Sequence, residues 1–109
     1  MKFQGFLALS LLGLSQIVMA SSTDSYELTI SNHQFEPTEL IIPANTKVKL
    51  LVHNKDNSPE EFESHALHRE KIIGPNQSGV INIGPLPAGV YEFVGEFHED
   101  TARGRIIVQ

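Results

Sequence analysis

The 109-residue chain contains no cysteine and no tryptophan, and its two methionines are Met1 and Met19. Without cysteine no disulfide can form, so the fold must be stabilised by packing or by a bound metal ion. No cysteine is present to carry a lipid anchor either. Beyond residue 20 the chain offers no sulfur ligand to a soft ion such as Cu(I), which disfavours a copper chaperone.

Basic residues are also scarce, because 8 Lys and Arg stand against 13 Asp and Glu, for a formal net charge of −5. Nucleic acids and anionic membrane surfaces are bound by clustered Lys and Arg. We therefore expect neither as a partner. An acidic chain is compatible with a cation ligand or with a basic partner protein.

The first 20 residues have the pattern of a secretory signal peptide. Lys2 precedes a nearly continuous apolar run over 6–14, and Val18 and Ala20 place small residues at the −3 and −1 positions. The apolar run is shorter than the roughly 20 residues that a membrane anchor needs. We expect residues 1–20 to be the signal peptide, residues 21–25 a flexible leader, residues 26–109 one domain, and the mature protein to be periplasmic.

The domain has the periodicity of short β-strands separated by turns rich in Gly, Pro and Asn. Alternating or continuous apolar segments lie at 26–30, 40–42, 48–53, 80–83, 91–93 and 105–109. About seven strands of this kind predict an all-β fold, a Greek-key β-sandwich. The stretch 60–69 is ambiguous, since Phe62 and Leu67 are too few apolar residues for an amphipathic helix.

Two segments, 60–63 and 96–100, concentrate carboxylates, and the second also carries His98. Hard carboxylate oxygens together with imidazole suit iron, or Cu(II) in a non-blue site, better than Cu(I). Such charge runs are also common on solvated surfaces. No Gly-rich phosphate loop, H-E-x-x-H helix or G-x-S-x-G motif is present, so a hydrolase has no support.

Strand alternation separates the carboxylates of the first segment. If Phe62 points into the core, Glu60 lies on the same face, and Glu61 and Glu63 lie on the opposite face. A metal site could then be built from Glu60 and His98 inside, or from Glu63 and Glu96 outside. The sequence leaves both open, with His98 favoured as a ligand.

These residues could instead have structural roles. Glu60 and Glu63 could form surface ion pairs with Arg69 or Lys71, and His98 could be a hydrogen-bonding residue. His65 and His68 could share one side of a helical turn, although loop positions are favoured for both. For His33 and His53, exposed turn and strand positions are expected.

Several of these segments, in their order and spacing, resemble the small periplasmic cupredoxins from Phe35 to Val108. The segments that carry the resemblance are 35–37, 43–46, 48–54 and 85–93. Blue-copper members carry a His after the loop proline, then a Cys, a second His and an axial Met. In this chain those positions hold Glu60, Gly95, His98, and Thr101 or Ala102. The resemblance therefore implies the fold but not blue-copper electron transfer, for which the thiolate is needed.

The departures at 59–64, 95–98 and 101–102 are similar to a cysteine-less cupredoxin subgroup associated with bacterial ferrous-iron permease systems. That resemblance implies a periplasmic metal-binding protein that assists Fe(II) oxidation or transfer to a permease. It implies copper, as non-blue Cu(II), or iron as the bound metal. The expected partners are ferrous or ferric iron and a membrane permease or periplasmic iron-binding protein. The alternative is a metal-free module that docks a membrane iron-transport partner.

Overall fold

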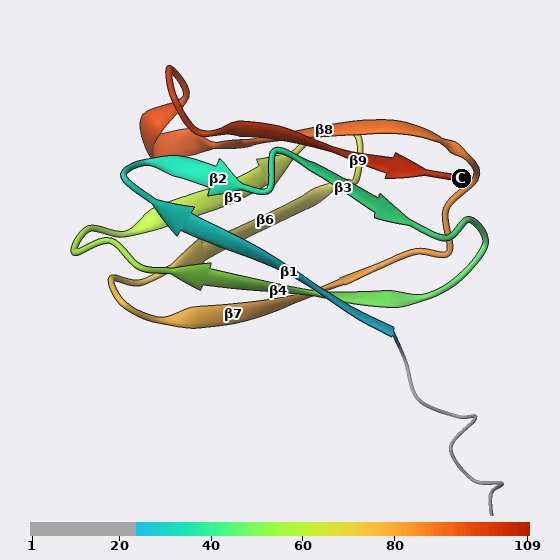
Figure 1. Ribbon diagram of the computed structural model, residues 1–109, viewed down its shortest axis with the longest axis horizontal. Helices are drawn as coiled ribbons and strands as arrows, with labels where there is room; N and C mark the ends of the chain where they lie inside the picture. The colour runs from blue at the N-terminus through green and yellow to red at the C-terminus, as the bar shows by residue number, and fades with distance from the viewer. Residues whose placement is uncertain (1–23) are drawn as a thin grey trace, which may run out of the picture.

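The computed structural model describes residues 24–109, so the predicted signal peptide and residues 21–23 of the predicted leader lie outside the described residues. Residues 24–109 form nine strands and a single turn of 3-10 helix, arranged as in Figure 1. The elements are β1 (Asp24–Ser31), β2 (Gln34–Glu36), β3 (Glu39–Ile42), β4 (Val48–Asn54), β5 (Glu60–Ser64), β6 (Arg69–Ile73), β7 (Ser78–Ile83), β8 (Gly89–Gly95), η3 (Glu96–His98) and β9 (Arg103–Val108). None of the helical structure within residues 24–109 is long and apolar enough to cross a membrane.

The strands form two mixed sheets that pack face to face. One has the order β2-β1-β4-β7 and the other β3-β9-β8-β5-β6. The pairs β1–β4 and β3–β9 are parallel, and the remaining neighbours are antiparallel. The prediction of an all-β sandwich is confirmed.

The predicted number of about seven strands is wrong, because residues 24–109 alone form nine. The ambiguous stretch 60–69 contains strand β5 and the turn that leads into β6. In β5 the inward positions are Glu60, Phe62 and Ser64, and two of these three are polar. Polar inward residues conceal the apolar alternation by which a strand is recognised in a sequence. The first strand also begins at Asp24, since Asp24 and Ser25 already pair with β4.

Three phenylalanines fill the core at the end of the sandwich that carries the candidate site. The ring of Phe35 meets those of Phe62 and Phe93 edge-on, at centroid distances of 6.3 and 4.9 Å, and Phe62 stacks on Phe93 at 5.1 Å. All three are buried. Large buried rings contribute strongly to stability and fix the strands that carry them. Phe62 thereby turns the neighbouring Glu61 and Glu63 outward and keeps Glu60 on the inner face, as predicted.

Candidate functional site

Glu60, at the start of β5, has a buried carboxylate, with 1% of the residue exposed. Its Oε1 accepts the backbone N–H groups of Glu61 at 3.0 Å and Phe97 at 2.9 Å. Its Oε2 lies 2.6 Å from Nδ1 of His98. Burying a charge is costly unless the group is paired and hydrogen-bonded. Both oxygens of Glu60 have such partners, so the protein itself satisfies this buried carboxylate.

Gly95, the last residue of β8, leaves the space that the Glu60 carboxylate occupies. A Cβ atom at Gly95 would lie 2.7 Å from Cδ of Glu60 and 2.7 Å from Cβ of Ala102. The chain pairs tightly here, since the Gly95 N–H donates to the Ala102 carbonyl at 2.8 Å. The resemblance to cupredoxins assigns the copper thiolate to this position. A cysteine would collide with Glu60, so the residues present do not fit a blue-copper centre.

His98 is part of an imidazole stack that sequence reasoning missed. Its ring lies on the ring of His33, with centroids 3.6 Å apart and planes 11° from parallel. The His98 side chain is 27% exposed. His33 was expected to be an exposed turn residue, whereas it is half-buried against His98.

The backbone around His33 is held from two sides. Asn32 and His33 form the two-residue β1–β2 turn with φ of 54° and 56°, and their N–H groups donate to the Asp56 carboxylate at 2.8 and 3.0 Å. Thr101 Oγ1 donates to the His33 carbonyl at 2.6 Å. The hydrogen bond from the His33 N–H is the main cause that lowers the pKa of Asp56, against the opposing effect of burial. The Asn-His pair is a recognisable signal for a hairpin turn with positive φ, but it does not reveal the contact with His98.

A second group of carboxylates lies on the outer face of the same sheet. We call Glu61, Glu63, Glu70 and Glu96 the outer carboxylate cluster. Glu63 faces Glu70 directly across the β5–β6 ladder, and its side chain is only 14% exposed. Glu96 lies within hydrogen-bonding reach of both Glu61 and Glu63, and Glu70 within reach of Glu61.

Proximity of like charges changes the acidity of the cluster. Burial, followed by the contacts with Glu70 and Glu96, raises the pKa of Glu61 from 4.5 to about 7. Contact with Glu96 is the main cause that raises the pKa of Glu63. Within the described residues the cluster's one ion-pair partner is His65, 3.7 Å from Glu63, and no Lys or Arg pairs with it. Among the described residues the cluster therefore has no Lys or Arg to balance its negative charge.

The predicted ion pairs with Arg69 and Lys71 do not form. Strand alternation puts those two residues on the face of β6 opposite to Glu63, and the Glu60 carboxylate is bonded to backbone N–H groups and to His98 instead. The Lys71 stem reaches to 3.0 Å from the Cβ position of Gly79 in β7, and Arg69 donates to the Asn82 carbonyl. His65 and His68 lie in the β5–β6 turn rather than in a helical turn.

The four predicted ligands fall into two pairs on opposite faces of β5. The structure brings Glu60 to His98 on the inner face, and Glu63 to Glu96 on the outer face. Across residues 24–109, no group of three or more His, Asp or Glu side chains is arranged to hold a metal ion. The assignment of these residues to a metal stays a prediction.

The two mixed sheets are closed by a short loop in which glycine takes the place of the thiolate. This is the fold of a small copper protein without its cysteine ligand. The chain belongs to the Cupredoxin-like domain family, which it matches over residues 5–108. It is 51% identical over 82 residues to an uncharacterized protein of Rickettsia prowazekii (strain Madrid E). That match covers 75% of this chain and 66% of the relative, so the chain spans just under two thirds of the relative's length.

Solved structures of copper proteins share the fold. The chain is similar to auracyanin A, a blue copper protein of Chloroflexus aurantiacus, with a TM-score of 0.69 and 14% identity over 81% of this chain and 100% of that one. It is also similar to the metal-binding domain of the Cu(I)-exporting ATPase CopA of Streptococcus pneumoniae D39, with a TM-score of 0.67 and 16% identity over 78% and 84% of the two chains. At these identities the likeness shows the fold alone.

Proposed function

We propose that this chain is a cupredoxin-like protein of ferrous-iron uptake that binds iron as cargo at the outer carboxylate cluster. The observation that carries the proposal is a group of four glutamates with no Lys or Arg partner among the described residues and a raised pKa at Glu61. A hard cation bound there would offset the repulsion between these carboxylates. Carboxylate oxygens favour iron over Cu(I).

The arrangement suits temporary binding better than permanent binding. Glu96 lies within reach of Glu61 and of Glu63, but the carboxylates do not form a closed set of three ligands. A cation must draw these side chains together, which weakens its binding and eases its release. Weak, exchangeable binding is what the transfer of an ion to a membrane partner requires.

The resemblance of segments 59–64 and 95–98 to the iron-permease subgroup supports iron as the cargo, the periplasm as the compartment and a permease as the receiver. Oxidation of Fe(II) to Fe(III) would release one electron. Residues 24–109 contain no cysteine, methionine or tryptophan to accept it. Bound Cu(II) or a membrane redox partner is the acceptor class that such a step requires.

A second candidate function is a metal-free docking module, and the closed contact between Glu60 and His98 favours it. Nδ1 of His98 and both oxygens of Glu60 already have partners within the protein. In this function the acidic face attracts Fe(II) without ligating it, and a surface of the domain docks the membrane partner.

Calorimetric titration of the purified, metal-stripped protein with Fe(II) under anaerobic conditions, and separately with Cu(II), tests both functions. We expect Fe(II) to bind the unaltered protein and to raise its melting temperature. The double variant Glu61→Gln/Glu63→Gln should lose this binding, because it removes two carboxylates and leaves Glu60 and His98 in place. The matched control is Glu99→Gln, which removes an exposed carboxylate in the turn after η3, outside the cluster.

Two further outcomes discriminate between the accounts. Loss of binding in His98→Ala with full binding in the double variant would move the metal to the inner pair. No heat and no thermal stabilisation with either metal would overturn metal binding and favour the docking module.

A further inference from the structure

Three cationic side chains converge on one cavity away from the outer carboxylate cluster. Lys47, Lys49 and Arg69 line a cavity of about 370 Å³, together with Val48, Asn82, Ile83 and Gly84. No carboxylate lines it. The two lysines lie about 20 positions from Arg69 in the chain, so the sequence shows no basic run. We call this site the cationic cavity.

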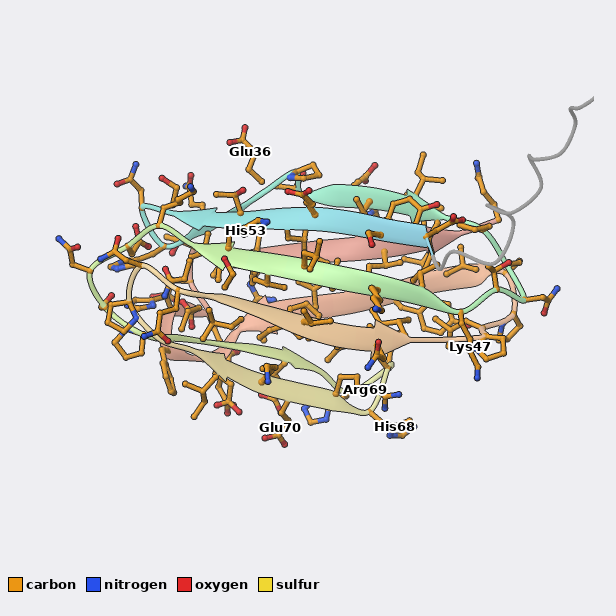
Figure 2. All side chains as sticks on the ribbon, turned by 90° about the horizontal axis from the view of Figure 1, so that it is seen from below. Glu36, Lys47, His53, His68, Arg69 and Glu70 are labelled. Atoms are coloured by element: carbon orange, nitrogen blue, oxygen red, sulfur yellow. The ribbon has the colours of Figure 1, made fainter. Side chains whose placement is uncertain are left out.

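Strand alternation explains why these charges gather. Lys47 and Lys49 flank the buried Val48 and point away from the core. Lys49 lies directly across from Asn82 in the β4–β7 ladder. Figure 2 shows Lys47 and Arg69 toward the same end of the sandwich. The start of β4 lies at the opposite end of the molecule from the 3-10 turn that carries Glu96 (Figure 1).

The guanidinium of Arg69 is already fixed in place. Its Nε donates to the Asn82 carbonyl and its Nη1 donates to the His68 carbonyl, each at 3.0 Å. A cation held in this way loses little further conformational freedom when it binds an anion. Among the described residues none of the three cations forms an ion pair with Asp or Glu, although the chain has 13 such acids. Their positive charges are therefore not balanced by a neighbouring carboxylate.

A smaller hollow adjoins the cationic cavity. It has a volume of about 160 Å³, and Arg69, Ile83 and Gly84 line both spaces. Its remaining lining residues are Leu67, Pro85 and Leu86. An anionic group in the larger cavity would thus have the side chains of Leu67, Pro85 and Leu86 beside it. An anion that carries an organic substituent can contact them, whereas a simple inorganic ion cannot.

We propose that the cationic cavity binds the phosphate group of a phosphate ester, whose organic part lies in the adjoining hollow. Arg presents paired N–H donors to phosphate oxygens, and Lys contributes point charges. A soluble phosphate ester and a phospholipid head group present the same chemistry. The site shares no residue with the outer carboxylate cluster, so this inference stands apart from the proposed function.

Titration of the full protein with phenyl phosphate at constant ionic strength tests the proposal, with binding detected by changes in NMR chemical shifts. We expect shifts confined to residues around the two spaces, and tighter binding than for inorganic phosphate. In Lys49→Gln/Arg69→Gln the affinity should fall about tenfold or more, since two charged hydrogen-bonding groups are lost. Lys55→Gln, a lysine in the loop after β4, is the matched control and should bind as the unaltered protein does.

Sedimentation with vesicles of phosphatidylglycerol or of phosphatidylcholine separates the two sources of the phosphate. Binding to phosphatidylglycerol vesicles that the double variant loses would identify a lipid head group. Binding of phenyl phosphate without vesicle binding would identify a soluble ester. Absence of all binding, or equal binding by the double variant, would overturn the proposal. If replacement of Arg69 prevents folding, Lys47→Gln/Lys49→Gln serves as the second variant.

Discussion

Gly95 and Glu60 depend on each other, because the Glu60 carboxylate occupies the space that a side chain at position 95 would need. The Glu60 carboxylate lies 2.7 Å from where a Cβ at Gly95 would be. It is also bonded to two backbone N–H groups and to His98. The position of the copper thiolate has thus become part of a buried hydrogen-bond network. Loss of the cysteine alone would have left a space, whereas this pair fills it.

Replacement of Gly95 by alanine should therefore be costly. We expect Gly95→Ala to lower the free energy of unfolding by about 1–3 kcal/mol, the usual cost of overpacking. Chemical denaturation measures this change. Gly89→Ala in the same strand is the matched control, since a Cβ there meets nothing nearer than Tyr91 at 3.5 Å. Equal effects of the two substitutions would contradict the proposed crowding at Gly95.

Restoring the thiol should not restore the copper site. We expect Gly95→Cys to show no blue-copper absorption when Cu(II) is added, because Glu60 fills the ligand space. Visible absorption spectroscopy gives the answer directly. Appearance of the intense thiolate-to-copper band in the single variant would show that Glu60 moves aside readily.

At the scale of elements, the β5–β6 hairpin sorts charge by strand alternation. In β5, Glu60 points inward while Glu61 and Glu63 point outward. In β6, Arg69 and Lys71 approach β7 while Glu70 faces Glu63 across the ladder. One hairpin therefore contributes to the inner pair, the outer carboxylate cluster and the cationic cavity.

The raised pKa of Glu61 predicts how stability depends on pH. Its pKa is raised from 4.5 to about 7 by burial and then by Glu70 and Glu96. Between these values the folded protein retains a proton that the unfolded chain has released. This carboxyl's contribution to stability is thus fully present below pH 4.5 and is lost as the pH rises through about 7.

Thermal denaturation from about pH 5 to about pH 8 at fixed ionic strength tests this dependence. We expect the melting temperature of the unaltered protein to fall over this range more than that of Glu61→Gln. Glu36→Gln, at an exposed position of β2, is the control and should follow the unaltered protein. Parallel curves for Glu61→Gln and the unaltered protein would contradict the assigned pKa.

The face on which each β5 side chain lies follows from the two-residue period of a strand. The contacts between elements join residues that are far apart in the chain, and local sequence patterns do not specify them. The alternation around Phe62 predicted which face each β5 glutamate takes, and the structure agrees. The contact between Glu60 and His98 joins residues 38 positions apart. His33 reaches His98 only because a positive-φ turn and Asp56 hold it there. Such long-range contacts follow from how the two sheets close, which local patterns do not specify.

At the scale of the whole molecule, a net charge of −5 conceals two separate charged regions. The outer carboxylate cluster lies on one face of β5 and β6, and the cationic cavity lies where β6 approaches β7 and β4. Local potentials, rather than net charge, decide which ligands a surface attracts. A cation and a phosphate group can therefore bind the same small domain at different places.

Iron is proposed to bind the outer carboxylate cluster while the inner pair remains closed. Anomalous diffraction at the iron edge, from crystals soaked anaerobically with Fe(II), tests this proposal most directly. We predict an iron peak bounded by Glu61, Glu63 and Glu96, with Glu60 still bonded to His98. An iron peak at Nδ1 of His98 with the Glu60 carboxylate displaced would contradict the claim and return the metal to the family's copper position.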